Sequence, residues 1–209
     1  MSFFEPPEPV EPPEHQPQPV WSGPPESALG AAATVEPVTL VSTDGLVIGV
    51  TDLVVYPEGL ELDVVVLRRR AAGRPKVPMA MHDLHMHVGQ QPDALLRFGI
   101  QFADGRKATN VGVSIPPGGR GGTLRVGVRV GGDEPPFPVL FPRGGGGNGL
   151  RYTQRFWLWP LPPPGSLVFA CEWPAEDVGL SRAEIDAGPI LEAAGLARVF
   201  WAPSAARPS

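Results

Sequence analysis

Alternating apolar and polar residues are the strongest pattern in this chain. In Thr123–Val130 every second residue is leucine or valine, and Leu60–Leu67 and Leu95–Phe102 follow the same period. A period of two is typical of a strand with one buried and one solvated face. Further apolar runs bounded by glycine- or proline-containing turns predict five more strands, over Pro37–Thr43, Leu46–Val55, Thr109–Ile115, Leu150–Trp159 and Ser166–Trp173.

The run Leu150–Trp159 differs because both of its faces are apolar. Phe156 and Leu158 lie on one face, whereas Trp157 and Trp159 lie on the other. Such a strand must be covered on both sides, which predicts a central position in the fold. We expect the C-terminal helix to cover the second face; the segment around Trp21 is the alternative cover.

The period changes toward the C-terminus. Ser181-Arg182-Ala183-Glu184 matches a capping box, in which a serine precedes a glutamate by three residues. Because proline is tolerated only in the first turn, we expect a turn and then a helix over about Pro189–Ala197. Arg198–Trp201 is predicted to be a short strand or a docked tail.

These elements predict a mainly β protein: an antiparallel β-sandwich of about seven to eight strands with one short C-terminal helix. The proposed organisation is a disordered, extended arm rich in proline and glutamate over residues 1–36, one sandwich domain over 37–201 and a frayed tail over 202–209. Two long loops are expected, over Arg68–Pro92 and Gly131–Gly149. The four glycines Gly144–Gly147 predict that the second loop is mobile.

Charge is unevenly distributed. The net charge is −5, and residues 1–26 contain five glutamates but no lysine or arginine, which leaves 17 acidic and 17 basic residues in the body. A neutral body does not attract nucleic-acid phosphates, so we expect no nucleic-acid binding. There is no basic and apolar leader at the start and no run of 18 apolar residues. We therefore expect a cytoplasmic protein without membrane contact.

The densest group of potential metal ligands is His82-Asp83-Leu84-His85-Met86-His87. In an extended chain His85 and His87 would point to the same side, and Asp83 or His82 would supply a third ligand for a divalent transition metal such as zinc, nickel or copper. The competing interpretation is a solvated loop without native metal binding. It is favoured because no distant ligand completes the set.

Three features predict contact with a partner protein. Pro6, Pro9 and Pro12 lie in Pro-x-x-Pro spacings, which suit aromatic grooves that bind polyproline helices, although a plain disordered arm is the simpler interpretation. Trp21 either docks on the body or meets a partner. The basic run Arg68-Arg69-Arg70 suits an acidic partner or the acidic arm itself, although a solvated strand end is the simpler interpretation.

Catalytic motifs are absent from the sequence. There is no Gly-x-Ser-x-Gly, no phosphate-binding Gly-x-x-x-x-Gly-Lys-Ser/Thr and no His-Glu-x-x-His. Cys171 has no activating neighbour, and its place in a strand predicts burial. The five tryptophans are likewise expected to pack in the core rather than to bind sugars.

Two segments carry a resemblance. Val20-Trp21-Ser22-Gly23-Pro24-Pro25-Glu26 and Arg155–Pro174, with Trp-Pro-Leu-Pro-Pro-Pro-Gly before an apolar strand, look like small uncharacterised proteins of GC-rich actinobacteria. The resemblance implies a shared β-sandwich-like fold and no known activity or site residues.

Two hypotheses of function follow. The preferred one is a non-enzymatic binding or structural module that contacts another protein and carries no cofactor. The alternative is a metal-binding protein or metal-dependent enzyme that uses His82, His85 and His87. A component of a larger assembly is a third hypothesis, and the oligomeric state is left open.

Overall fold

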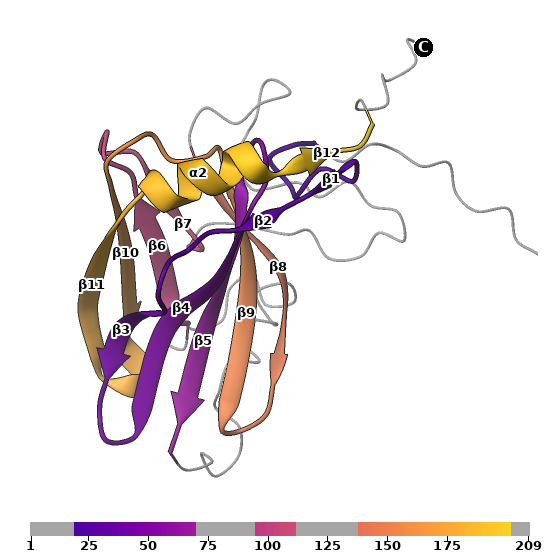
Figure 1. Ribbon diagram of the computed structural model, residues 1–209. Helices are drawn as coiled ribbons and strands as arrows, with labels where there is room; N and C mark the ends of the chain where they lie inside the picture. Colours follow the sequence, from indigo (N-terminus) through magenta and orange to yellow (C-terminus); the bar gives the residue numbers. More distant parts are fainter. Residues whose placement is uncertain (1–18, 70–94, 112–137, 202–209) are drawn as a thin grey trace, which may run out of the picture.

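Two antiparallel sheets pack face to face in the computed structural model, which describes residues 19–69, 95–111 and 138–201 (Figure 1). The mainly β sandwich expected from the sequence is thereby confirmed.

The larger sheet has six strands in the order β2-β4-β5-β9-β8, with β3 paired to β4. Buried residues alternate with more exposed ones along β4, so one face of the sheet turns inward. β9 lies between β5 and β8, which confirms the interior position predicted for this strand. The strands are β2 (Ala31–Ala32), β3 (Val38–Ser42), β4 (Leu46–Val55), β5 (Leu60–Arg68), β8 (Val139–Gly147) and β9 (Arg151–Trp159).

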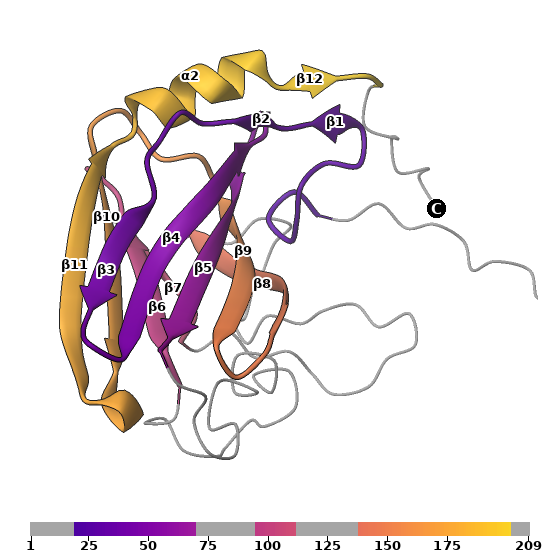
Figure 2. The same ribbon diagram turned by 60° about the horizontal axis from the view of Figure 1, so that its bottom comes forward.

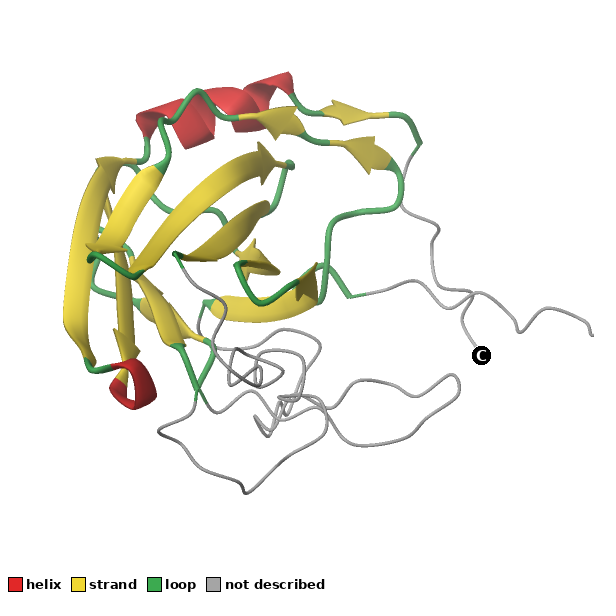
Figure 3. Ribbon diagram, turned by 90° about the horizontal axis from the view of Figure 1, so that it is seen from below, coloured by secondary structure: helices red, strands yellow, loops and turns green. Residues whose placement is uncertain are grey.

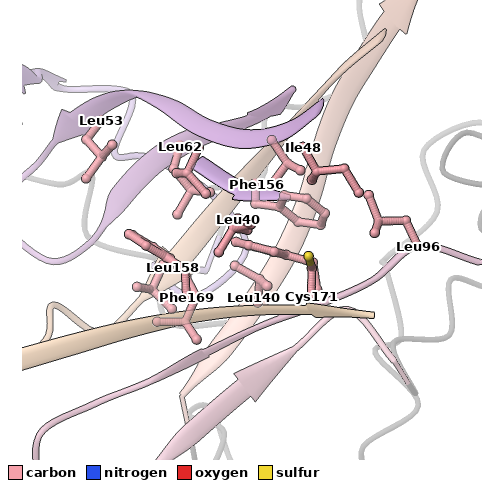
Figure 4. Close-up of a cluster of buried hydrophobic side chains, with 14 of the residues drawn as sticks. Leu40, Ile48, Leu53, Leu62, Leu96, Leu140, Phe156, Leu158, Phe169 and Cys171 are labelled. Carbon is pink, nitrogen blue, oxygen red and sulfur yellow. The ribbon is translucent and has the colours of Figure 1, made fainter. Parts of the chain in front are cut away.

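The smaller sheet has four strands in the order β11-β10-β6-β7. Its inner face meets the larger sheet through aromatic rings: Phe98 stacks on Phe156 across the sandwich, with ring centres 5.6 Å apart, and on Phe169 at 6.3 Å. Cys171 is buried in the same core, as expected (Figure 4). The strands are β6 (Arg97–Gln101), β7 (Lys107–Thr109), β10 (Ser166–Trp173) and β11 (Val178–Asp186).

The helix α2 (Gly188–Leu196) confirms the predicted C-terminal helix, but its position differs from the expected one. It lies across one end of the sandwich, near β2 and β4, and buries Ile190 and Ala193 in the main core (Figures 1 and 2). The expectation that it covers the outer face of β9 is therefore wrong.

Ser181–Glu184 is strand and not a helix cap. Asp177 takes a left-handed conformation (φ 54°) after the short 3-10 helix η2 (Pro174–Glu176), and the chain then returns along β10. β11 pairs with nearly the whole of β10, and Ala183 and Ile185 pack against the core. Pairing over this length outweighs the local capping signal.

The four glycines Gly144–Gly147 also differ from the expected mobile loop, because they form the second half of β8. They pair with Tyr152–Arg155 of β9. The side chains of Tyr152 and Gln154 occupy the space beside Gly145, where a Cβ would lie 2.8 Å from the Tyr152 hydroxyl and 2.7 Å from Gln154 Oε1. Gln154 in turn donates from Nε2 to the Gly144 carbonyl at 2.9 Å.

Part of the segment 19–36, which was assigned to the arm, lies against the sandwich: Trp21 packs on the outer face of the larger sheet, and Ala31, Ala33 and Val35 pack on the main core. β2 pairs with the end of β4, and the preceding β1 (Ala28–Leu29) pairs with β12 (Arg198–Val199) just after the helix. A Cβ on Gly30, between β1 and β2, would lie 2.6 Å from Val54 and 2.9 Å from the Tyr56 ring. Glycine thus permits this close approach of the backbone.

Candidate functional site

Most of the site residues expected from the sequence lie outside the described residues. They are His82, Asp83, His85 and His87 of the metal hypothesis and Pro6, Pro9, Pro12 and Arg70 of the partner hypothesis. Within the described ranges, no three His, Cys, Asp or Glu side chains gather closely enough to hold a metal ion.

Arg68 does not form a solvated basic patch with its neighbours. Its side chain is 10% exposed, with Nη2 2.8 Å from Glu176 Oε1 and Nη1 donating to Oε2 at 3.1 Å. The guanidinium also lies over the Trp173 ring, 5.4 Å from its centre. Since Arg68 ends β5 and Glu176 follows β10, this ion pair joins the two sheets. Arg69 remains exposed.

Trp21 docks on the body, one of the two outcomes considered from the sequence. It packs against a small apolar cluster on the outer face of the larger sheet, formed by Val139, Phe141, Trp157 and Trp159. The Trp157 indole N–H donates to the Val20 carbonyl at 3.0 Å. The segment around Trp21 is therefore the cover of the second face of β9.

A charged hollow of about 250 Å³ adjoins this cluster on the outer face. It is lined by Asp63, Thr153, Arg155 and Gly144–Gly146. Arg155 donates to both carboxylate oxygens of Asp63, from Nε at 2.8 Å and from Nη2 at 2.9 Å. These hydrogen bonds raise the pKa of Arg155 above its usual value, and nearby Glu61 and Asp52 act in the same direction. This pair neutralises itself and presents no unpaired charge to a ligand.

The most distinctive surface is a two-stranded ribbon formed by β1 and β12. In Figures 2 and 3 the ribbon continues the line of α2 beyond the two sheets. Five large apolar side chains on and beside it are exposed, and we call them the ribbon patch. They are Leu29 (64% exposed), Leu196 (71%), Val199 (56%), Phe200 (56%) and Trp201 (66%).

The pairing of the ribbon distributes these side chains over both of its faces. Residues that lie opposite each other in an antiparallel pair share a face, and Leu29 is opposite Arg198 while Ala28 is opposite Val199. Phe200, which donates its N–H to the Ser27 carbonyl at 2.8 Å, therefore shares a face with Leu29. Val199 lies on the other face. The chain bends at Trp201, which lies beyond the end of β12.

The ribbon patch exposes a large apolar area. The five fractions correspond to on the order of 600 Å² of exposed surface, shared between the two faces of the ribbon and the end of α2, and the largest apolar patch on a soluble monomer is about 300–600 Å² and is often functional. Phe200 and Trp201 also contact each other edge to face, with ring centres 5.7 Å apart. Apolar surface of this extent is typical of a protein-binding site.

Sequence reasoning missed this surface. We expected Trp201 in the core together with the other tryptophans, and the structure contradicts this for Trp201. The available signal was the run Val199-Phe200-Trp201 directly after the helix, with no polar residue to form a solvated face.

No helix in the described part of the chain is long and apolar enough to cross a membrane. No protein-family model, curated protein sequence or solved structure matches the chain.

Proposed function

We propose that this chain is a protein-binding module and that the ribbon patch is its contact surface. The observation that carries the proposal is the exposure of four large apolar side chains on one short ribbon and directly after it: Leu29, Val199, Phe200 and Trp201. A two-stranded ribbon is only marginally stable by itself in water. A partner that covers the patch would bury apolar surface and supply the packing that the ribbon lacks.

The rest of the described surface supports a binding module rather than an enzyme. The outer-face hollow contains a self-neutralised ion pair, and the half-buried ion pair of Arg68 and Glu176 links the sheets. The Cys171 thiol is buried, and burial raises its pKa to about 11, so it is a poor nucleophile at neutral pH.

The proposal is tested by site-specific photo-crosslinking in cells that express the full chain. A photoreactive phenylalanine analogue replaces Trp201, and a matched control replaces Leu180, which is 57% exposed on β11. We expect a discrete protein adduct from position 201 that is absent from position 180 and is lost when Val199 and Phe200 are changed to serine. Equal labelling from the two positions, or no adduct from position 201, would contradict the proposed surface.

A further inference from the structure

We infer that the ribbon is coupled to a latch, residues 19–22, whose docking on the outer face of the larger sheet controls whether the ribbon patch is presented to a partner. This regulation rests on the proposed function, because it acts on the same surface. Three features of the chain support it: the contacts that hold the latch, the stiff link between the latch and β1, and the small extent of the ribbon.

The latch is a closed turn that the body binds at two points. The Ser22 N–H and hydroxyl both donate to the Pro19 carbonyl, at 2.9 Å and 2.8 Å, and close the turn. The Trp157 indole N–H donates to the Val20 carbonyl at 3.0 Å, and Arg143 Nη1 donates to the Ser22 carbonyl at 3.1 Å. Both donors are side chains of the larger sheet, so docking of the latch leaves the strand pairing of that sheet unchanged.

Trp21 anchors the latch between these two hydrogen bonds. Its side chain packs against the apolar cluster on the outer face, and the residue itself is only partly buried. Gly23 follows directly, and a Cβ there would lie 2.7 Å from Arg143 Nη1, so the bare backbone gives the guanidinium room beside the latch. The latch can therefore be weakened through Trp21 or Arg143 without a change in either strand of the ribbon.

A short and stiff link joins the latch to β1. Residues 23–27 form this link, and they include Pro24 and Pro25. Each proline has a fixed φ and restricts the residue before it. The Ala28 N–H donates to the Pro25 carbonyl at 3.2 Å, which adds a turn directly before the ribbon. A docked latch thus limits the positions that β1 can take.

The ribbon itself is small. β1 and β12 pair over two residues each, and the Phe200 N–H extends the ribbon by donating to the Ser27 carbonyl at 2.8 Å. A short two-stranded ribbon is marginally stable, and its closure costs the conformational entropy of the residues that it orders. Because a docked latch has already restricted the link to β1, the ribbon closes at a lower entropic cost when the latch is docked.

Coupling of this kind is reciprocal. A partner that holds the ribbon closed also tightens the latch. Conversely, a ligand that displaces Trp21 from the outer face opens the ribbon and weakens binding there. The outer face of the larger sheet thus regulates the ribbon patch although none of the exposed apolar side chains of the patch lies on it.

Closure of the ribbon is measured with a disulfide between its two strands in the full chain. Ala28 and Val199 lie directly opposite each other, and the Cα separation of about 4.5–5.5 Å in an antiparallel pair suits a disulfide. In Ala28→Cys/Val199→Cys, thiol–disulfide exchange with glutathione gives the effective concentration of the two thiols, which falls as the ribbon opens. Cys171 is 1% exposed and does not interfere.

We expect Trp21→Ala and Arg143→Met each to lower this effective concentration at least about fivefold, the lower end of typical couplings between sites. Arg143 is exposed, so Arg143→Met preserves the fold even where Trp21→Ala does not. Arg151→Met is the matched control, because Arg151 is an exposed arginine on the strand that pairs with β8, and it should leave the effective concentration unchanged.

The reverse direction is measured at the latch. The Trp157 indole N–H is fully buried and donates to Val20, so its hydrogen exchange, followed by NMR, reports on release of the latch. It should exchange at least about fivefold faster in Phe200→Pro, which removes the N–H that binds Ser27, than in the disulfide-locked ribbon.

These measurements separate the regulation from the proposed function. Equal effective concentrations with the intact and the altered latch, or equal exchange of the Trp157 indole in the locked and the opened ribbon, would overturn the coupling. A photo-adduct at position 201 that persists in that case would leave the proposed function standing. If the coupling is present, Trp21→Ala should lose the adduct, and the disulfide between positions 28 and 199 should restore it.

Discussion

Gly145 provides a sharp test of how β8 packs, because its two neighbours act as built-in controls. A Cβ at Gly145 would lie 2.9 Å from the Thr153 carbonyl oxygen and close to the side chains of Tyr152 and Gln154. A Cβ at Gly144 or Gly146 would meet no atom within 4 Å. The same glycine-to-alanine change is thus predicted to have opposite effects at adjacent positions of one strand.

The magnitudes follow from the contacts. Overpacking of a well-packed site costs about 1–3 kcal/mol, and loss of the Gln154 hydrogen bond to the Gly144 carbonyl adds about 1 kcal/mol. Gly145→Ala should therefore lower the free energy of unfolding by about 2–4 kcal/mol. At Gly144 and Gly146 the main effect is reduced entropy of the unfolded chain, which should stabilise the protein by about 0.4–1 kcal/mol.

Urea unfolding followed by tryptophan fluorescence measures these effects, since Trp157 and Trp173 are fully buried and report on both sheets. The three alanine variants should share one m value and differ in midpoint. If Gly145→Ala were as stable as Gly144→Ala, Tyr152 and Gln154 would not require a bare backbone at this position. Our explanation of the glycine run would then be refuted.

Three further predictions concern the ion pair, the thiol and the histidines. Arg68→Met should lower the free energy of unfolding by about 1–3 kcal/mol in chemical denaturation, because it leaves Glu176 without its cation. The control Arg69→Met changes an exposed neighbour and should alter the free energy of unfolding by less than about 0.5 kcal/mol. Burial raises the pKa of Cys171 from 9.0 to about 11, so the folded state keeps the thiol proton at pH values where the unfolded state loses it. The free energy of unfolding should therefore fall as the pH rises from 9 to 11. A Cys171→Ala variant with the same decline in denaturation midpoint would contradict this prediction. If the histidine cluster binds a metal, elemental analysis of untagged protein should give a stoichiometry near one that His85→Ala abolishes, and a value near zero in both proteins would reject the metal hypothesis.

The sheets were largely predictable because period-two burial is a local property of the sequence. Leu60–Leu67 and Ser166–Trp173 became β5 and β10 with little change in their bounds. The two apolar faces of β9 correctly placed it between covered surfaces. Burial of Cys171 followed from the same alternation.

The errors arose where long-range pairing outweighs a local signal. Four successive glycines have no side-chain pattern from which a strand can be predicted. Only the positions of Tyr152 and Gln154 on β9 explain why residue 145 must have no side chain. Ser181–Glu184 carries a good helix-start signal, but the pairing of β11 along β10 determines its structure. Asn110 shows a similar effect. Its side-chain amide accepts a hydrogen bond from the Phe98 N–H and donates one to the Leu96 carbonyl, and no sequence motif predicts these contacts.

The ribbon patch was hidden from sequence reasoning because it joins the two ends of the described chain. Leu29 and Phe200 are far apart in sequence, and neither residue belongs to a long alternating run. Their meeting depends on the segment that crosses the outer face of the larger sheet, where Arg143 donates to the Ser22 carbonyl at 3.1 Å and Trp157 donates to Val20. Docking of this segment thus leads the chain to β1, and β1 in turn pairs with β12. A change that frees the segment, such as Trp157→Phe, should therefore weaken binding at the ribbon although it touches none of the exposed apolar side chains.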